Sequence, residues 1–475
     1  MTIDELLAEI EAGPKGPKIG AFFDFDGTLI AGYSAAVFYE DRVRKRQFSV
    51  GELVRTLAAV AEMEIRGTDV NKLMGVAISH WAGRSEAEVT ETFERLFHDR
   101  IAGNVYPETR ELVKAHHRAG HTVALATSAT RYQAAPLADD LAVEHLLATE
   151  VETVQGNFTG FFAGDILWGP AKARAVKQLA RRAKVDLARS YGYANGDEDV
   201  PFLEVVGNPR PLNPAGGLER FARENDWPVS RFSSRGRPGL GSIVRTGAAL
   251  AGISAAGGVG LAVGALNRSR RQAANLATAI GPDLALALAG VNLNVTGAEH
   301  LWSDRPAVFV FNHQSSVDVA VLGSLIRRDL TGVAKKELMH DPRFAPIGFI
   351  VDIAYVDRSD PTQARAALAP AVEKLRSGVS IAIAPEGTRS ATQRLGRFKK
   401  GAFHLAMQAG VPIIPIVIRN AGDVMWRGSI LIRSGTVDVA VLPPISTEHW
   451  EVGELDQRIG EVRDLFIETL EHWPS

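Results

Sequence analysis

Short apolar runs that end in polar clusters are the main pattern along this chain of 475 residues. Such runs occur at 19–23, 123–127, 191–194, 307–311 and 381–384, and each is typical of a buried strand. In an α/β sheet, chemistry is usually placed just beyond the carboxyl ends of the strands. The length exceeds what one hydrophobic core usually supports. We therefore expect two α/β domains, each with its functional side chains directly after a strand.

The run at 307–311 brings His313 to a strand end, and Asp318 follows after small or polar residues. A carboxylate on one imidazole nitrogen fixes the tautomer, so that the other nitrogen can take a proton from a hydroxyl. The pair is the His–Asp half of triad chemistry without a protein nucleophile, and the hydroxyl would come from a substrate. The alternative is an ordinary surface hydrogen bond between His313 and Asp318.

The run at 381–384 also ends in a polar cluster, and this cluster favours an anion site. Arg389 offers a planar fork suited to phosphate, and Gly387 lets backbone amides approach an anion. Further positive charge nearby in the sequence comes from Arg358, Lys399 and Lys400. Two strand ends thus predict a base beside an anion site.

Four blocks in this half resemble, in order and spacing, those of the glycerolphosphate acyltransferase superfamily. They are Asn-His-x4-Asp at 312–318, a Gly-containing apolar stretch leading to Arg358, Pro-Glu-Gly-Thr-Arg-Ser at 385–390, and Val-Pro-Ile-Ile-Pro at 411–415. The resemblance covers about residues 290–475. It is closest to the 1-acylglycerol-3-phosphate acyltransferases.

This resemblance implies a reaction and a set of site residues. His313 would deprotonate the sn-2 hydroxyl of lysophosphatidate, which attacks the thioester of acyl-CoA or acyl carrier protein, while Asp318 orients the imidazole. The acceptor phosphate and its surroundings would be held by Arg358, Glu386, Gly387, Thr388 and Arg389. Within that set, Glu386 would fix Arg389, since a carboxylate does not bind phosphate. Glycerol 3-phosphate or a glycolipid hydroxyl as the acceptor stays open, because the chemistry is shared.

In the N-terminal half, the run at 19–23 leads into Asp-Phe-Asp-Gly-Thr-Leu at 24–29. With period two, Asp24 and Asp26 project on the same side, and a bound cation would relieve their repulsion. An acidic loop that caps a helix is the alternative. The hexapeptide resembles the phosphatases of the haloacid dehalogenase superfamily. The resemblance implies that Asp24 is the nucleophile, that Asp26 is the general acid/base, and that Mg2+ is the cofactor.

Later blocks of that superfamily follow in order. Ser128, after the run at 123–127, would donate to a phosphoryl oxygen, and Lys172 would offset charge on the aspartyl phosphate. Matching Asp199-Val-Pro-Phe-Leu to the family pattern puts Asn195 where a magnesium-binding Asp is usual, which removes one charge from the metal site. The expected metal ligands are therefore Asp24, Asp26, Asn195 and Asp199, and Asp197 is an alternative through a shifted loop.

Residues 34–106 are expected to form a mostly helical cap, similar to that of the phosphoserine-phosphatase branch. That branch carries a Glu for the substrate amine where this chain has Tyr33, so phosphoserine is not favoured as the substrate. Because of Asn195, a non-catalytic phosphate-binding or scaffold module is the alternative for this half.

A long uncharged segment at 246–267 separates the two halves. About 20 apolar residues suffice to cross a bilayer, but this segment is mostly Ala and Gly, so a buried helix of a soluble domain is the alternative. A single crossing would put the two halves on opposite sides. The segment would therefore lie in the interface or pair with residues 273–291, which Pro282 interrupts. Arg268, Arg270 and Arg271 would suit anionic headgroups.

Small residues recur every four positions in this segment, and such a stripe lets two helices approach closely. The stripe consists of Ala248, Gly252, Ala256, Gly260 and Gly264. Its partner would be the same helix of a second subunit, slightly favoured, or the segment at 273–291. The expected domains are a phosphatase at 1–230, a basic linker at 231–245, membrane-associating helices at 246–291 and an acyltransferase at 292–475.

Composition narrows the setting. The formal net charge of −2 gives no general case for nucleic acid, and the absence of cysteine fits a reducing compartment. The acidic first residues do not form a signal peptide pattern. We expect a membrane-associated enzyme at the cytoplasmic face, with a lysophospholipid, acyl-CoA or acyl carrier protein, and the membrane surface as partners.

Overall fold

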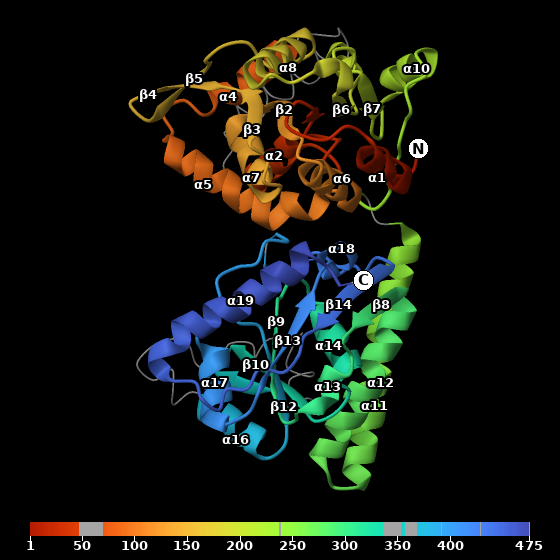
Figure 1. The fold of residues 1–475 in the computed structure, drawn as a ribbon, viewed down its shortest axis with the longest axis vertical. Coiled ribbons are helices and arrows are strands. Elements are labelled where there is room, and N and C mark those ends of the chain that lie inside the picture. The colour runs from red at the N-terminus through yellow and green to blue at the C-terminus, as the bar shows by residue number, and fades with distance from the viewer. Residues whose placement is uncertain are drawn as a thin grey trace. The chain divides into compact units, whose positions relative to one another are not determined.

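A computed structural model of the chain (Figure 1) describes residues 1–46, 70–236, 239–335, 353–356, 368–390, 392–427 and 429–474. The chain divides into two compact units, Met1–Arg237 and Pro238–Ser475, and each is considered by itself. Residues 47–69 of the cap expected at 34–106, the apolar stretch leading to Arg358, and Arg358 itself lie outside the described residues. The predicted fold class, two α/β domains, is confirmed.

A parallel sheet forms the centre of the N-terminal unit, in the order β3-β2-β1-β6-β7. The strands are β1 (Gly20–Phe23), β2 (Thr122–Thr130), β3 (His145–Thr149), β6 (Tyr191–Ala194) and β7 (Asn208–Pro211). All four residues of β1 are buried, because this strand is central and covered on both faces. Asp24 therefore leaves the middle of the sheet at its carboxyl end.

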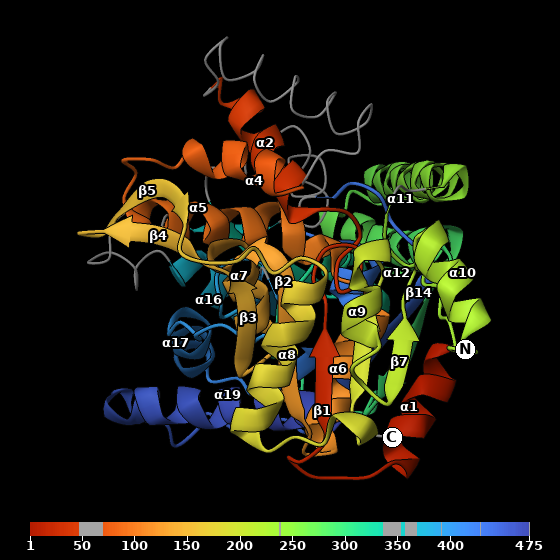
Figure 2. The same ribbon diagram turned by 90° about the horizontal axis from the view of Figure 1, so that it is seen from above.

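Helices cover both faces of this sheet. Phe22, Ala124 and Ala126 share a core with α8 (Pro170–Ala183), α9 (Val200–Leu203) and α10 (Gly216–Glu224). Figure 2 shows α8 and α9 lying over the strands. On the other face, Phe23 contacts His116 of α6 (Pro107–Arg118), against which α1 (Ile3–Ala12) packs. The helix α7 (Arg131–Asp140) follows β2 and contacts β2 and β3.

The helical cap has an aromatic core of its own. Its described helices are α2 (Ser34–Arg44), α4 (Val70–Ser79) and α5 (Glu86–Leu96). Phe38, Trp81 and Phe93 pack together, and Phe158 joins them from a hairpin of β4 (Val151–Val154) and β5 (Asn157–Phe162). The sequence predicted the helices but not this hairpin, whose contribution comes from a distant part of the chain.

The C-terminal unit contains a sheet in the order β11-β10-β12-β9-β13-β14-β8, in which β13 and β14 are antiparallel and the other pairs parallel. The strands are β8 (Val291–Thr296), β9 (Val308–Phe311), β10 (Leu330–Lys335), β11 (Ala354–Val356), β12 (Ser380–Ile383), β13 (Ile413–Ile418) and β14 (Gly435–Val441). β9 is the middle strand, between β12 and β13. Because these three strands are parallel, their carboxyl ends meet at one edge of the sheet.

Alternate residues of β9 face two different cores. Val308 and Val310 pack with helices α16 (Ala369–Arg376), α17 (Gly401–Ala409) and α19 (Leu455–Glu471), whereas Phe309 and Phe311 pack with α12 (Arg270–Ala289) and α14 (Asp318–Ile326). The short helices α13 (His300–Ser303) and α18 (Ala421–Val424) lie on the same side as α14. A strand buried on both faces needs this continuous apolar run.

A helical hairpin of α11 (Leu240–Leu266) and α12 begins the C-terminal unit. Helix α11 begins at Leu240, so residues 240–245 of the linker predicted at 231–245 are helical. Pro282 was expected to interrupt the second segment, yet it lies inside α12 and packs against Gly323 of α14. Asp283 accepts hydrogen bonds from Ser324 of α14 and from Arg327, which directly follows this helix. These contacts attach α12 to the acyltransferase-like core.

The small-residue stripe of α11 faces α12 of the same chain. Gly252, Ala256, Gly260 and Gly264 are buried. A methyl group at Gly264 would lie 2.4 Å from the Cβ of Ala273, so only glycine permits this approach. Of the two partners that the sequence left open, the structure uses the intrachain one.

A buried chain of hydrogen bonds lies beneath the site at the end of β1. Tyr193, stacked on Phe23, contacts Nε2 of His116; Nδ1 of His116 lies 2.8 Å from Nδ1 of His121; and Nε2 of His121 contacts the Pro14 carbonyl. Because a carbonyl only accepts, His121 carries its proton on Nε2 and accepts on Nδ1, so His116 donates from Nδ1 and accepts from the tyrosine. With both imidazoles neutral, this arrangement gives every group a partner.

We predict that acid destabilises this unit through the histidine pair. Burial lowers the pKa of both rings. The pKa of His116 is lowered further by His121, His117 and Lys15, and the pKa of His121 is lowered further by Lys15. The unfolded chain then binds protons below the ordinary pKa of 6.5 that the folded chain excludes, so stability falls as pH drops through that value.

The measurement is the melting temperature at pH 7.5 and pH 5.5. Replacing both rings (His116→Gln with His121→Gln) should lower the melting temperature at pH 7.5 but shrink its acid-induced fall by about 4 °C, corresponding to 1–2 kcal/mol in a unit of this size. An equal fall in parent and variant would contradict the assignment.

Candidate active sites

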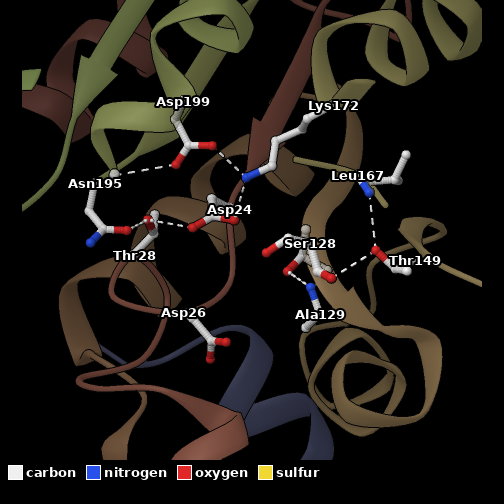
Figure 3. Close-up of polar contacts among 12 residues, drawn as sticks. Asp24, Asp26, Thr28, Ser128, Ala129, Thr149, Leu167, Lys172, Asn195 and Asp199 are labelled. Atoms are coloured by element: carbon white, nitrogen blue, oxygen red, sulfur yellow. Dashed lines mark hydrogen bonds and ion pairs between the residues drawn. The ribbon is translucent and has the colours of Figure 1, made fainter. Parts of the chain in front are cut away.

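The first site is built around Asp24, the residue that follows β1. Its Oδ1 lies 2.8 Å from Nζ of Lys172, and its Oδ2 accepts a hydrogen bond from the Thr28 hydroxyl. Lys172 reaches it from the first turn of α8 and also lies 2.5 Å from Oδ1 of Asp199. All three charged side chains are buried, and Figure 3 shows Lys172 between the two carboxylates.

Burial and charge act against each other at this cluster. Burial raises the pKa of Asp24 to about 6, since the lowering by Lys172 is partly offset by Asp199. Burial disfavours the ammonium of Lys172, but Asp24 and Asp199 outweigh it and raise the pKa of Lys172. The lysine is therefore a fixed positive charge beside the nucleophile candidate, where it would offset charge on a phosphorylated carboxylate.

Asn195 enters the same site from the end of β6. Its Oδ1 accepts a hydrogen bond from the Thr28 hydroxyl, 3.0 Å away, which also lies 3.2 Å from Asp24 Oδ2. Gly27 has a φ of +78°, and a methyl there would lie 2.3 Å from the Asn195 amide nitrogen. Glycine at 27 is thus needed for both the backbone turn and this close approach.

These oxygens have a chemistry that suits Mg2+. The Thr28 hydroxyl has one proton and cannot donate to Asp24 and Asn195 at the same time. One of these two oxygens can therefore accept from, or bind, another positively charged group. Carboxylate and amide oxygens are ligands that Mg2+ takes. Within the described ranges, no cluster of three or more His, Cys, Asp or Glu is arranged for a metal. Asp197 instead accepts from the backbone N–H of Leu218, so it is committed to α10.

Asp26 lies apart from the Lys172 cluster (Figure 3). Its two carboxylate oxygens accept hydrogen bonds from the backbone N–H and the hydroxyl of Ser34, at 2.7 and 3.0 Å. Burial raises the pKa of Asp26 to about 7, although both bonds to Ser34 lower it. A carboxyl group with a pKa close to neutral is suited to both donating and accepting a proton.

Ser128 and Tyr33 complete the predicted residues of this half. Ser128 lies in β2, where its carbonyl accepts from the Thr149 hydroxyl, and Figure 3 places it across from Asp24. Tyr33 precedes the first turn of α2 and is 65% exposed. The structure thus brings Asp24, Lys172, Asn195 and Asp199 together, with Asp26 and Ser128 on the same edge of the sheet.

The second site is the His313–Asp318 pair beyond β9. Nδ1 of His313 lies 2.8 Å from Oδ2 of Asp318, which also accepts from the backbone N–H groups of Gln314 and Ser315. Asp318 is fully buried at the first position of α14. Because the carboxylate can only accept, Nδ1 of His313 carries the proton and Nε2 is the acceptor nitrogen in the neutral ring.

Two neighbouring strands hold this loop in place. Asn312 exchanges two hydrogen bonds of 2.7 Å with the backbone of Ile418 at the end of β13. From beyond β12, Glu386 accepts from the backbone N–H groups of His313 and Gly396. The sequence assigned Glu386 the task of fixing Arg389; the bonds seen here tie its carboxylate to the backbone of His313 and of Gly396. Burial raises the pKa of Glu386.

The predicted anion-binding residues lie around the same edge. Nη1 of Arg389 donates to the Ser316 hydroxyl at 2.7 Å, which places the guanidinium beside the His313 loop. Gly387 has a φ of +74°, and a methyl there would lie 2.9 Å from Nζ of Lys399. Lys400 is engaged elsewhere, in an ion pair with Asp456. Thr388 follows Gly387 in this loop.

Several contacts in the two sites were not predicted from the sequence. Thr28, Ser34, Ser316 and Asn312 carry bonds that join segments far apart in the chain, with Asn195, Gln133, Arg389 and Ile418 as their partners. Thr28 and Asn312 stand inside the recognised blocks, so their positions were signalled although their partners were not. Ser34 and Ser316 gave no signal that distinguishes them from ordinary surface serines.

Two α/β units, each with a polar site at the carboxyl end of its middle strand, define a protein with two separate catalytic centres. Comparison with known proteins agrees. Residues 21–204 match the family described as haloacid dehalogenase-like hydrolase, and residues 292–419 match the family described as acyltransferase. The chain belongs to the haloacid dehalogenase-like hydrolases through its N-terminal half, and its C-terminal half is an acyltransferase domain.

Individual relatives fall on the same two halves. A Mycobacterium tuberculosis protein named phosphoserine phosphatase SerB1 is 35% identical over 50% of this chain and 79% of its own length. A 1-acyl-sn-glycerol-3-phosphate acyltransferase of Limnanthes alba is 31% identical over 39% of this chain and 66% of its own. The crystal structure of an acyltransferase of the same type from Thermotoga maritima covers 50% of this chain and 97% of its own, with 23% identity and a TM-score of 0.42.

Proposed function

We propose that the C-terminal half transfers an acyl chain from a thioester to the sn-2 hydroxyl of lysophosphatidate. The observation that carries this proposal is the fixed tautomer of His313, whose Nδ1 is held by Asp318 while Nε2 remains the basic nitrogen. In the reaction, Nε2 takes the hydroxyl proton as the oxygen attacks the thioester carbonyl. The C–S bond of acyl-CoA or acyl carrier protein then breaks, and the imidazolium returns its proton to the departing thiolate.

The acceptor is inferred from the positive groups beside the base. Arg389, oriented by Ser316, and the Gly387 backbone next to Lys399 supply a fork and an open backbone suited to a phosphomonoester. Relatives that act on 1-acyl-sn-glycerol 3-phosphate by name support the same acceptor. Arg358 would add charge to this site.

We predict that purified protein with lysophosphatidate and an acyl-CoA releases free CoA, and that His313→Ala abolishes the release. Asp24→Asn is the matched control, because it alters the other half and should leave CoA release unchanged. Retained release in His313→Ala would remove the proposed base. A panel with glycerol 3-phosphate and glycolipids in place of lysophosphatidate identifies the acceptor.

Asp318→Asn sharpens the same test. The amide oxygen can replace Oδ2 and keep all three hydrogen bonds, while the amino group takes the place of Oδ1, a buried atom with no partner among the described residues. The variant should fold but lose the charge that stabilises the imidazolium. The turnover number should fall by roughly 100-fold or more.

We infer that the N-terminal half is a Mg2+-dependent phosphomonoesterase. Asp24 would attack phosphorus, Asp26 would protonate the leaving oxygen, Lys172 would offset the negative charge, and Ser128 would donate to a phosphoryl oxygen. Asp24, Asn195 and Asp199 are the candidate ligands of Mg2+, which would neutralise charge on the substrate phosphate. Asp26, which the sequence also assigned to the metal, lies apart from them with both carboxylate oxygens on Ser34 and is proposed only as the acid/base residue. Tyr33 supplies no carboxylate for a substrate amine, so phosphoserine is not the proposed substrate.

We expect phosphate release from a panel of phosphomonoesters, phosphoserine included, in the presence of Mg2+. Chelation with EDTA and the variant Asp24→Asn should each stop the release, while His313→Ala should not affect it. If Asp24→Asn is as active as the parent, the nucleophile assignment is wrong. No release by the parent from any ester would favour a phosphate-binding or scaffold module.

We propose that α11 lies against the cytoplasmic face of a membrane. It is the one helix among the described residues that is long and apolar enough to cross a membrane. Its small residues face α12, while large apolar side chains are exposed, namely Leu240, Ile243, Val244, Leu250, Val259, Leu261 and Leu266. Arg271 is bound to Asp329, so the proposed headgroup contact is assigned to Arg268, which is exposed.

Flotation with anionic phospholipid vesicles tests this placement. The double variant Leu250→Asp with Val259→Asp should reduce the vesicle-bound fraction by about tenfold or more, because each buried side chain contributes about 1.5–3 kcal/mol. The control is Val452→Asp with Leu465→Asp, which changes two exposed apolar residues near and in α19. Equal losses in both variants would argue against α11 as the membrane-binding surface.

A further inference from the structure

A chain of hydrogen bonds connects Asp26 to the start of α7 through two residues that the proposed reaction does not yet use. Oε1 of Gln133 accepts from the backbone N–H and the hydroxyl of Thr130, at 2.9 and 2.7 Å. These two donors fix the amide orientation, so the Gln133 nitrogen points away from Thr130. That nitrogen donates to the Ser34 hydroxyl at 3.3 Å.

The orientation of Gln133 decides the direction of the Ser34 hydroxyl. Because Ser34 Oγ already accepts from an amide nitrogen, its own proton is directed to Oδ2 of Asp26, 3.0 Å away. The Ser34 backbone N–H donates to the other oxygen, Oδ1. Ser34 is fully buried, and Thr130 and Gln133 are buried as well, so water does not compete for these bonds.

We propose that Ser34 and Gln133 are positioning residues that hold the Asp26 carboxyl group in one orientation for proton transfer in the phosphatase reaction. This inference rests on the proposed phosphomonoesterase function. Ser34 begins α2 in the cap, and Gln133 belongs to α7, which follows the strand carrying Ser128. The network therefore joins the acid/base residue to the cap and to the strand that would contact the phosphoryl group.

The two Ser34 donors act at a defined stage of the reaction. An oxygen of Asp24 forms a bond to phosphorus while the bond from phosphorus to the ester oxygen breaks. The departing ester oxygen takes the proton of Asp26. Asp26 is left as a carboxylate, which the two hydrogen bonds from Ser34 stabilise. In the second stage it takes a proton from the water that attacks phosphorus, so that phosphate leaves and both aspartates are restored.

The same bonds could serve α2 alone, because Tyr33 provides no side-chain cap and Asp26 satisfies the first N–H of the helix. A purely structural role would lower the rates for all substrates together. Proton donation matters most when the leaving oxygen is basic, and little when it departs easily as an anion. The dependence of rate on the leaving group therefore separates the two roles.

The experiment measures kcat/KM, which reports the first phosphoryl transfer, for 4-nitrophenyl phosphate and for an alkyl phosphate. In Ser34→Ala, kcat/KM for the alkyl phosphate should fall by about 10–100-fold, which is part of the usual contribution of general acid catalysis. For 4-nitrophenyl phosphate, kcat/KM should fall by no more than about threefold. Ser190→Ala removes another buried hydroxyl of the same unit, bonded to Gly20 and Asp186, and should change both values by the same factor.

Gln133→Glu tests the direction of the chain with almost no change in shape. One carboxylate oxygen can still accept from Thr130, but the other now accepts from the Ser34 hydroxyl and draws its proton away from Asp26. This variant should reproduce the selective loss of Ser34→Ala, whereas Gln133→Met should show a smaller one because the hydroxyl stays free to donate to Asp26.

The outcomes are distinct. Equal losses for both substrates in Ser34→Ala and in Gln133→Glu would overturn the positioning role and leave the phosphatase function standing. A parent protein that releases phosphate from neither ester, at any Mg2+ concentration, would overturn the phosphatase function itself and the positioning role with it. Folding of each variant is checked by its melting temperature against Ser190→Ala.

Discussion

A buried carboxylate at the carboxyl end of the middle strand is the constraint around which each half of this protein is built. Asp24 follows β1, and Asp318 begins α14, directly after the loop that follows β9. An ionised carboxylate taken out of water costs several kcal/mol unless charged or hydrogen-bonding partners replace the solvent. The rest of each site can be understood as the supply of those partners from neighbouring strands and helices.

The two halves meet this requirement in different ways, and the difference matches their chemistry. Asp24 is held by the ammonium of Lys172, a full charge that would also serve a phosphorylated intermediate. Asp318 is held by two backbone N–H groups and by His313, so its charge is directed at the imidazole. The negative charge around a nucleophile such as Asp24 must be offset as it reacts, whereas an orienting carboxylate such as Asp318 must keep its negative charge.

The sequence located both candidate sites because strand ends and recognised blocks are local features. Apolar runs at 191–194 and 307–311 became β6 and β9, and the residues after them came together as parallel strands require. Partners that depend on tertiary contacts could not be predicted. Glu386 binds the His313 backbone 73 residues away, Asp26 binds Ser34 across a turn, and the hairpin β4–β5 adds to the cap core. None of these pairs has a periodicity or composition that identifies it.

The helical hairpin shows how a local pattern can have two outcomes that only packing decides. A stripe of small residues suits any close helix partner, and α12 occupies that position here. Helix α12 is in turn bound to α14 through Asp283 and buries Ala285, Leu286 and Ala289 in the core of its unit. A helix with this ion pair and these core contacts is anchored to the protein, and α11 is packed along it. For α11 to span a bilayer alone, it would have to leave this packing and expose a face of glycines, whereas the packed helix keeps its large apolar side chains on the outer face.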